Sequence, residues 1–189
     1  MQNVNIIEDF YSPEHYGIMQ HFLHTTNMKA LYQPNKVYYP NRLQAYPCWE
    51  TEKFEENMMP YDIFKKTLEL KTGFKTKEIN SFFRTIKKSE LEQSPFLGKD
   101  ESMVHQDDKG GKIFFAGIVY FNSFSIKDGT RIYSYKDQIE PDIIIGSKPN
   151  RCIIYRSDLF HSAGIDWRQD QRTVQVFFFN LEGDSNAQS

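Results

Sequence analysis

Arg172-Thr-Val-Gln-Val-Phe-Phe-Phe-Asn180 carries a clear strand pattern in this 189-residue chain. Val174, Val176 and Phe178 recur with a period of two on the same side as Arg172. This alternation predicts a strand with one face toward a core, and an arginine aimed inward at one end of it. A buried guanidinium needs a partner, and a carboxylate bound by two hydrogen bonds is the natural one. An internal Asp or Glu is the alternative partner.

Residues 78–181 form the strand-rich part of the chain. Turn signals rich in Gly, Pro, Asn and Asp separate most of the candidate strands. The expected strands are 79–86, 103–106, 112–122, 129–134, 143–146, 151–156, 159–163 and 172–181. Short strands in this number, after an N-terminal helical region, predict a mainly β protein with a double-sheet jelly-roll fold, cupin-like in form.

The N-terminal part is expected to support that β core. Val4 to Glu8 should form a strand, and Ser12 should cap a helix that begins with Pro13. A second helix is expected over 62–71, ending at Gly73. The residues expected to face inward are Ile18, Met19, Phe22 and Leu23 in the first helix, and Ile63, Phe64, Leu68 and Leu70 in the second.

Residues 28–61 are rich in Tyr, Pro and Trp and show no regular period. Two interpretations stay open for them: an ordered loop packed on the core, or a wall or lid of a substrate pocket. We expect one domain over 1–189, with support from 1–77, a β core over 78–181 and a frayed tail over 182–189.

Composition disfavours several classes of protein. The formal net charge is −2, which disfavours a nucleic-acid partner, and Lys87 and Lys88 are expected at a solvated strand end. Cys48 and Cys152 are too few for a disulfide framework, which favours buried thiols and a cytoplasmic location. The first nine residues do not resemble a secretory signal, and no stretch has the ~20 apolar residues needed to cross a membrane.

Two histidines and one carboxylate in the strand-rich part suggest a metal site. In His105-Gln-Asp107 the ligand types are two residues apart, so both point to one face of a strand. His161 enters a later expected strand. Two His and one Asp are the ligand set of a facial-triad non-haem iron(II) site. The alternative for His161 is a buried structural histidine, and His21 and His24 are expected in ordinary surface or packing roles.

Several segments beyond these residues match the pattern of one family. They are Ile7-Glu-Asp-Phe-Tyr-Ser-Pro-Glu14, Gly117-Ile-Val-Tyr-Phe-Asn122, Asp128-Gly-Thr-Arg-Ile-Tyr133 and the turn-strand-turn over 148–161. The chain resembles the Fe(II)/2-oxoglutarate-dependent dioxygenases, most closely the prolyl-4-hydroxylase-like branch. The resemblance covers most of 78–181 and, loosely, 4–24. Asp128 stands where the family's Gly-Gly-x-Thr turn has its first glycine.

The resemblance implies a distorted double-stranded β-helix with iron on His105, Asp107 and His161. It also implies that Arg172 pairs with the far carboxylate of 2-oxoglutarate, with Tyr120 hydrogen-bonded to the same carboxylate and Thr130 lining the pocket. A core aromatic is the alternative role for Tyr120.

Two other arginines bear on this assignment. Many members carry a tyrosine on the strand before H-x-D, where this chain has Phe82-Phe-Arg84. Arg84 could reach the pocket or be solvated, and we favour solvation. Arg168, the rival to Arg172, should be solvated too.

The activity implied by the resemblance is hydroxylation of an unactivated C–H bond with O₂, as 2-oxoglutarate is decarboxylated to succinate. The expected substrate is a small molecule or a peptidyl group, such as a prolyl or amino-acid side chain. Ascorbate stays open as an additional cofactor, and the oligomeric state is not predicted. Because Asp107 is present, hydroxylation or oxidative demethylation is favoured over halogenation. Two alternatives remain: a cupin-like metal enzyme that does not use 2-oxoglutarate, and a catalytically silent barrel that serves as a binding module.

Overall fold

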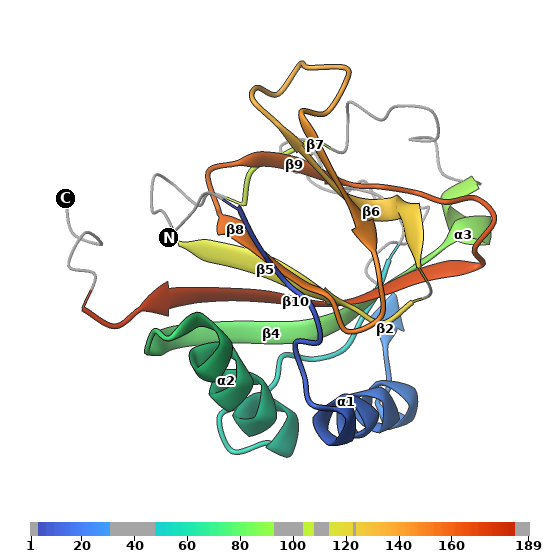
Figure 1. The fold of residues 1–189 in the computed structure, drawn as a ribbon. Helices are drawn as coiled ribbons and strands as arrows, with labels where there is room; N and C mark the ends of the chain where they lie inside the picture. Colours follow the sequence, from blue (N-terminus) through green and yellow to red (C-terminus); the bar gives the residue numbers. More distant parts are fainter. Residues whose placement is uncertain (1–3, 31–47, 93–103, 108–113, 123, 184–189) are drawn as a thin grey trace.

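The structure is a computed structural model that describes residues 4–30, 48–92, 104–107, 114–122 and 124–183. A large antiparallel sheet forms its centre, with helices α1 and α2 on one side and a smaller sheet on the other (Figure 1). None of the helices in these ranges is long and apolar enough to cross a membrane.

The elements follow in this order: β1 (Val4–Ile7), α1 (Pro13–Thr25), β2 (Lys29–Ala30), β3 (Trp49–Glu50), α2 (Met59–Thr72), β4 (Thr76–Lys87), α3 (Lys88–Glu92), β5 (Phe115–Tyr120), β6 (Ser125–Tyr133), β7 (Ile143–Ser147), β8 (Cys152–Arg156), β9 (Phe160–Ala163) and β10 (Gln171–Leu181). The large sheet has the strand order β1-β8-β5-β10-β4-β3-β2, and the small sheet has the order β7-β6-β9.

Period-2 alternation in the central strands divides the core into two layers. Phe83, Val119 and Phe177 pack toward α1 and α2, in one buried cluster. The neighbouring positions Val174 and Val176 belong to a second cluster on the opposite face, toward the small sheet. The alternation read from 172–180 therefore predicted the strand and its inward face correctly, since Arg172 shares the face of Val174 and Val176.

Both predicted helices are present, and their ends have the expected chemistry. The Oγ of Ser12 accepts a hydrogen bond from the His15 backbone N–H at 3.2 Å, and Pro13 stands in the first turn of α1. Helix α2 ends at Gly73, which adopts a left-handed conformation with φ of 75° and donates its N–H to the Glu69 carbonyl. Met19 is fully buried in α1.

One inward-facing prediction in α2 was wrong. Ile63, Phe64 and Leu68 are buried, as expected, but Leu70 is 82% exposed. The reason is helical geometry. Positions 64 and 68 are one turn apart on the same face, whereas position 70 follows 68 by two residues and points to the opposite side.

Several element boundaries differ from the sequence-based expectation. Residues 28–61 contain short strands β2 and β3, which extend the large sheet beyond β4; residues 31–47 of this segment lie outside the described residues. The expected strand 103–106 is reduced, from 104 onward, to a single bridge between His105 and His161, and Met103 lies outside the described residues. The expected strand 112–122 is observed as β5 from Phe115 to Tyr120, with 112 and 113 undescribed.

Gly117 in β5 should tolerate no side chain. A Cβ built there would lie 2.3 Å from the Ile153 carbonyl oxygen and 2.5 Å from the Phe177 ring. We predict that Gly117→Ala lowers the free energy of unfolding by about 1–3 kcal/mol, the usual cost of overpacking. Gly17→Ala is the matched control, since an added Cβ there meets nothing within 4 Å, and it should stabilise α1 by about 0.4–1 kcal/mol. Urea denaturation measures the free energy of unfolding of both variants. Equal changes in the two variants would contradict the close packing around Gly117.

Candidate metal centre and adjoining cavity

His105, Asp107 and His161 come together at one end of the space between the sheets. Their potential ligand atoms all lie within 4.8 Å of one another. The His105 Nε2 is 3.7 Å from one oxygen of Asp107, and the His161 Nε2 is 3.4 Å from the other. Two donors at right angles, each ~2.1 Å from one ion, lie about 3 Å apart, so the two His–Asp separations are within about 1 Å of the spacing that a metal requires.

Backbone hydrogen bonds place the three residues. The N–H of His105 donates to the His161 carbonyl at 2.9 Å, and the N–H of His161 donates to the His105 carbonyl at 2.8 Å. The Asp107 N–H donates to the Ser157 carbonyl at 2.9 Å. Gln106, between the two ligands, is exposed, which agrees with the expected alternation of side chains.

His161 is held in the form that binds metals. It is buried, and desolvation lowers the pKa of its imidazole from 6.5 to about 4, so that the ring is neutral near pH 7. Its Nδ1 lies 3.0 Å from the Leu159 carbonyl oxygen. A neutral imidazole in contact with a carbonyl must carry its proton on Nδ1, which leaves the lone pair of Nε2 free for a metal. The ring of Tyr155 contacts the ring of His161 at 4.6 Å between centroids.

A cavity of about 800 Å³ adjoins the three ligand residues and lies between the two sheets. Its wall on the large sheet is mainly apolar and comes mostly from β4, β5 and β10, with Glu50 of β3 and Tyr155 of β8 at its sides. Its wall on the small sheet comes from β6 and β9. Its lining side chains include Glu50, Phe82, Arg84, Thr130, Arg172, Val174 and Val176.

Arg172 brings a positive charge into this cavity and is only 4% exposed. Its Nε donates to the Asp128 carbonyl at 3.0 Å, and Nη2 lies 3.4 Å from the Gly129 carbonyl oxygen. Among the residues that the structure describes, no carboxylate pairs with this guanidinium. The internal Asp or Glu considered as its alternative partner is therefore not seen in the described residues.

Tyr120 and Thr130 lie beside Arg172. The two hydroxyl groups are 2.8 Å apart, and the guanidinium carbon of Arg172 is 5.7 Å from the centre of the Tyr120 ring. Burial raises the pKa of Tyr120, and the nearby arginine partly offsets that rise. Thr130 lines the cavity, whereas Tyr120 is fully buried behind it. The structure thus brings the expected residues together, and the direct contact of Tyr120 with a co-substrate stays a prediction.

The expectation that Arg84 is solvated was wrong. Arg84 lines the cavity, and its Nε donates to Glu50 at 2.6 Å. Because β4 alternates, Arg84 shares a face with Phe82 and lies opposite Val174 of β10. Glu50 comes from β3, inside the aromatic segment 28–61, so the described part of that segment does supply a residue of the cavity wall.

The expectation of a solvated Lys88 was also wrong. Strand β4 ends at Lys87, and the Lys88 backbone N–H donates to the Asp170 carbonyl at 2.9 Å. The Lys88 side chain is consequently 5% exposed, and its Nζ lies 2.6 Å from Asp128. Arg168, by contrast, is exposed as expected, and it holds the pKa of the Asp166 carboxyl well below its usual range.

Sequence reasoning missed the roles of Glu50, Arg84 and Lys88 because their partners are far away in the sequence. Strand parity provided a signal for Arg84, since it is two residues from Phe82. The same parity holds for Lys88, two residues after the buried Ile86, but the expected strand ended at Ile86.

Comparison with solved structures shows which fold this is. An oxidoreductase of the 2OG-Fe(II) oxygenase family from Burkholderia pseudomallei aligns with a TM-score of 0.63 and 9% identity, over 94% of this chain and 85% of that one. A prolyl hydroxylase from Trichoplax adhaerens, in complex with a hypoxia-inducible factor peptide fragment, aligns with a TM-score of 0.61 and 10% identity, over 100% and 88%. HygX from Streptomyces hygroscopicus, with nickel and 2-oxoglutarate bound, aligns with a TM-score of 0.59 and 10% identity, over 96% and 84%.

These similarities confirm the predicted fold: the chain has the double-stranded β-helix fold of the 2OG-Fe(II) oxygenases, prolyl hydroxylases among them. At the level of sequence, no protein-family model and no curated protein matches this chain.

We predict that His161→Ala removes stoichiometric Fe(II) binding. Loss of an outer-shell partner already costs about 10–100-fold in metal affinity, so loss of a ligand should cost more. His24→Ala, on α1, is the control and should bind Fe(II) normally. Anaerobic equilibrium dialysis measures both. Full iron occupancy in His161→Ala would remove this residue from the ligand set.

The lowered pKa of His161 predicts a pH-dependent stability of the metal-free protein. The unfolded chain binds a proton at a pKa near 6.5 and the folded chain only near 4, so stability falls as the pH drops through this window. The loss from this group between pH 7 and pH 5 should be about 2 kcal/mol. Chemical denaturation at both pH values should show a smaller loss for His161→Gln than for the wild type or for the control His21→Gln. Equal losses of stability in all three proteins would contradict a lowered pKa of His161 in the folded protein.

Proposed function

We propose that this chain is an Fe(II)- and 2-oxoglutarate-dependent dioxygenase that hydroxylates an unactivated C–H bond. The observation that carries the proposal is a buried arginine without a described carboxylate partner in the same cavity as two histidines and an aspartate. A metal site and a free positive charge in one cavity match a ligand that chelates a metal at one end and carries a carboxylate at the other.

His105, Asp107 and His161 would hold the iron. Their donor set leaves open positions on the metal, as a facial triad does. The solved structure of HygX, of the same fold, has nickel and 2-oxoglutarate bound, which supports the choice of co-substrate. When bound, iron, 2-oxoglutarate and O₂ together supply the oxidation, in which 2-oxoglutarate becomes succinate and CO₂ and a substrate C–H bond gains a hydroxyl group.

Arg172 would hold the far carboxylate of 2-oxoglutarate. Its contacts with two backbone carbonyls fix the guanidinium, and a charged partner satisfies its remaining N–H groups. Thr130 lies near Arg172, on the cavity wall that the small sheet forms. The apolar side chains of Phe82, Val174 and Val176 line the space between, and an apolar lining lowers the local dielectric constant and so would strengthen the pairing of opposite charges.

The substrate would be a polar small molecule or a peptidyl group. The charged pair Arg84–Glu50 is part of the cavity lining and offers both a hydrogen-bond donor and an acceptor. Proteins of this fold include one solved with a peptide fragment and one solved with hygromycin B. A cytoplasmic location is part of the proposal, and it is supported by two cysteines that are buried and free.

An anaerobic titration of the metal-free protein with Fe(II) and then 2-oxoglutarate tests the proposal. We expect a visible charge-transfer band that appears only when both are present, because the keto acid must chelate iron at open positions. Iron binding without a band would favour a metal enzyme that does not use 2-oxoglutarate. Failure to bind iron would favour a silent barrel.

We predict that Arg172→Ala weakens 2-oxoglutarate binding and leaves Fe(II) affinity nearly unchanged. Loss of one member of a buried charge pair should cost about 3 kcal/mol or more, which is on the order of a hundredfold. Arg168→Ala is the control, since Arg168 is exposed and pairs with Asp166. The same titration provides the two affinities. An unchanged 2-oxoglutarate affinity in Arg172→Ala would assign the role to another residue.

A further inference from the structure

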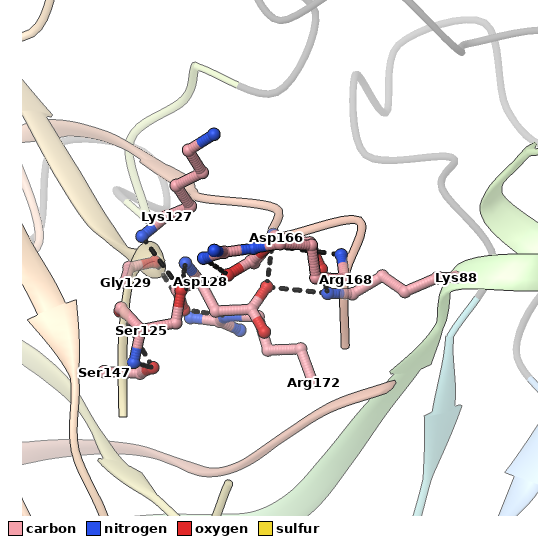
Figure 2. A network of polar contacts seen from close by, with 9 residues as sticks. All are labelled: Lys88, Ser125, Lys127, Asp128, Gly129, Ser147, Asp166, Arg168 and Arg172. Atoms are coloured by element: carbon pink, nitrogen blue, oxygen red, sulfur yellow. Dashed lines mark hydrogen bonds and ion pairs between the residues drawn. The ribbon is translucent and has the colours of Figure 1, made fainter. Parts of the chain in front are cut away.

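We propose that Lys88 holds the carboxylate of Asp128 away from Arg172. The guanidinium of Arg172 then has no internal carboxylate partner and can bind a ligand carboxylate. Figure 2 shows Lys88, Asp128, Asp166 and Arg172 in one network of polar contacts. The inference rests on the proposed function of Arg172, and it assigns Lys88 as a positioning residue outside the metal site.

Asp128 is the acid best placed to neutralise Arg172 internally. The guanidinium already contacts the backbone of this residue, since its Nε donates to the Asp128 carbonyl at 3.0 Å. The Asp128 side chain starts from the same residue and is fully buried. A buried carboxylate next to a buried guanidinium would normally form a bidentate pair. In this structure, however, the carboxylate of Asp128 does not pair with Arg172.

Lys88 accounts for that arrangement. Its Nζ lies 2.6 Å from Oδ1 of Asp128 and 3.0 Å from the Asp166 carbonyl oxygen. The same Oδ1 accepts the Asp166 backbone N–H at 2.6 Å. The other oxygen, Oδ2, is buried and has no hydrogen-bond partner among the described residues. Asp128 is therefore anchored through one oxygen, and its second oxygen is free to accept from a new donor.

Four charged side chains in the network form two pairs of opposite charge. Lys88 pairs with Asp128, and Arg168 pairs with Asp166, with Nη2 of Arg168 2.7 Å from Oδ2 of Asp166. Arg172 remains with one positive charge and, among the described residues, no acid to neutralise it. One carboxylate from a ligand completes the balance. Without Lys88, Asp128 would be a buried, unpaired anion, and the nearest remaining cation for it would be Arg172.

The test is calorimetric titration of 2-oxoglutarate into the Mn(II)-loaded protein, with Mn(II) affinity measured separately. Lys88→Met should weaken 2-oxoglutarate binding by at least about tenfold and leave Mn(II) affinity unchanged, because Asp128 then competes for Arg172. The double variant Lys88→Met/Asp128→Asn removes the competitor together with the lysine, so its affinity should return close to the wild-type value. Lys127→Met is the matched control, since Lys127 is the exposed neighbour of Asp128.

Three results would overturn the inference. One is a folded Lys88→Met protein that binds 2-oxoglutarate like the wild type, even if it is less stable, because the network then only supports the fold. Another is equal weakening in the single and double variants, which would exclude competition by Asp128. The third is a tenfold or greater loss in Asp128→Asn alone, which should bind at least as tightly as the wild type.

Two further cases keep the test decisive. If Lys88→Met does not fold, Lys88→Gln replaces it, since glutamine can donate a hydrogen bond to Asp128 but carries no charge. We expect Lys88→Gln to bind 2-oxoglutarate several-fold more weakly than the wild type. Unchanged binding would again overturn the inference. If the wild type itself shows no metal-dependent binding of 2-oxoglutarate, the proposed function fails. If instead the wild type binds 2-oxoglutarate and the variants bind it equally well, the proposed function stands and only the inference about Lys88 fails.

Discussion

Two reciprocal backbone hydrogen bonds between His105 and His161 join segments that are far apart in the sequence, and the metal centre depends on them. One segment carries the H-x-D spacing and the other enters β9. Because the bonds fix both backbones, the two imidazoles lie side by side, with ring centroids 4.2 Å apart. Asp107 is fixed by its own backbone bond to Ser157. The main chain thus fixes where the three candidate ligand residues lie.

The second constraint is that charged side chains inside the β core need partners of opposite charge. A cation there is tolerated only if it is paired, because its desolvation costs several kcal/mol. Lys88 has its acid within the protein, whereas Arg172 has two carbonyl oxygens and no carboxylate among the described residues. The two buried cations therefore differ: Lys88 is compensated inside the protein, whereas Arg172 is, by our proposal, available to a ligand carboxylate. Under the proposed function, a co-substrate would bind the metal at one end of the cavity and Arg172 at the other.

Much of the fold could be predicted from local sequence, because its signals depend only on neighbouring residues. The alternation over 172–180 placed Val174 and Val176 on the inward face of β10, as observed. Ser12 and Gly73 marked helix ends through capping geometry that involves residues at most a few positions away. Leu70 shows the limit of this reasoning. Its hydrophobicity suggested burial, but its angular position on α2 placed it in solvent.

Local sequence was enough to identify the residue types of the site, the spacing of two in H-x-D and the strand that carries Arg172. Which side chains meet one another, in contrast, depends on the tertiary structure. It brought Thr130 of β6 to Tyr120 of β5, turned Arg84 toward Glu50, and buried Lys88 against Asp128. The physical reason is that periodicity specifies the face of a strand on which a side chain lies. The partner across the cavity depends on how two sheets stack, and this is settled by contacts between residues distant in the chain.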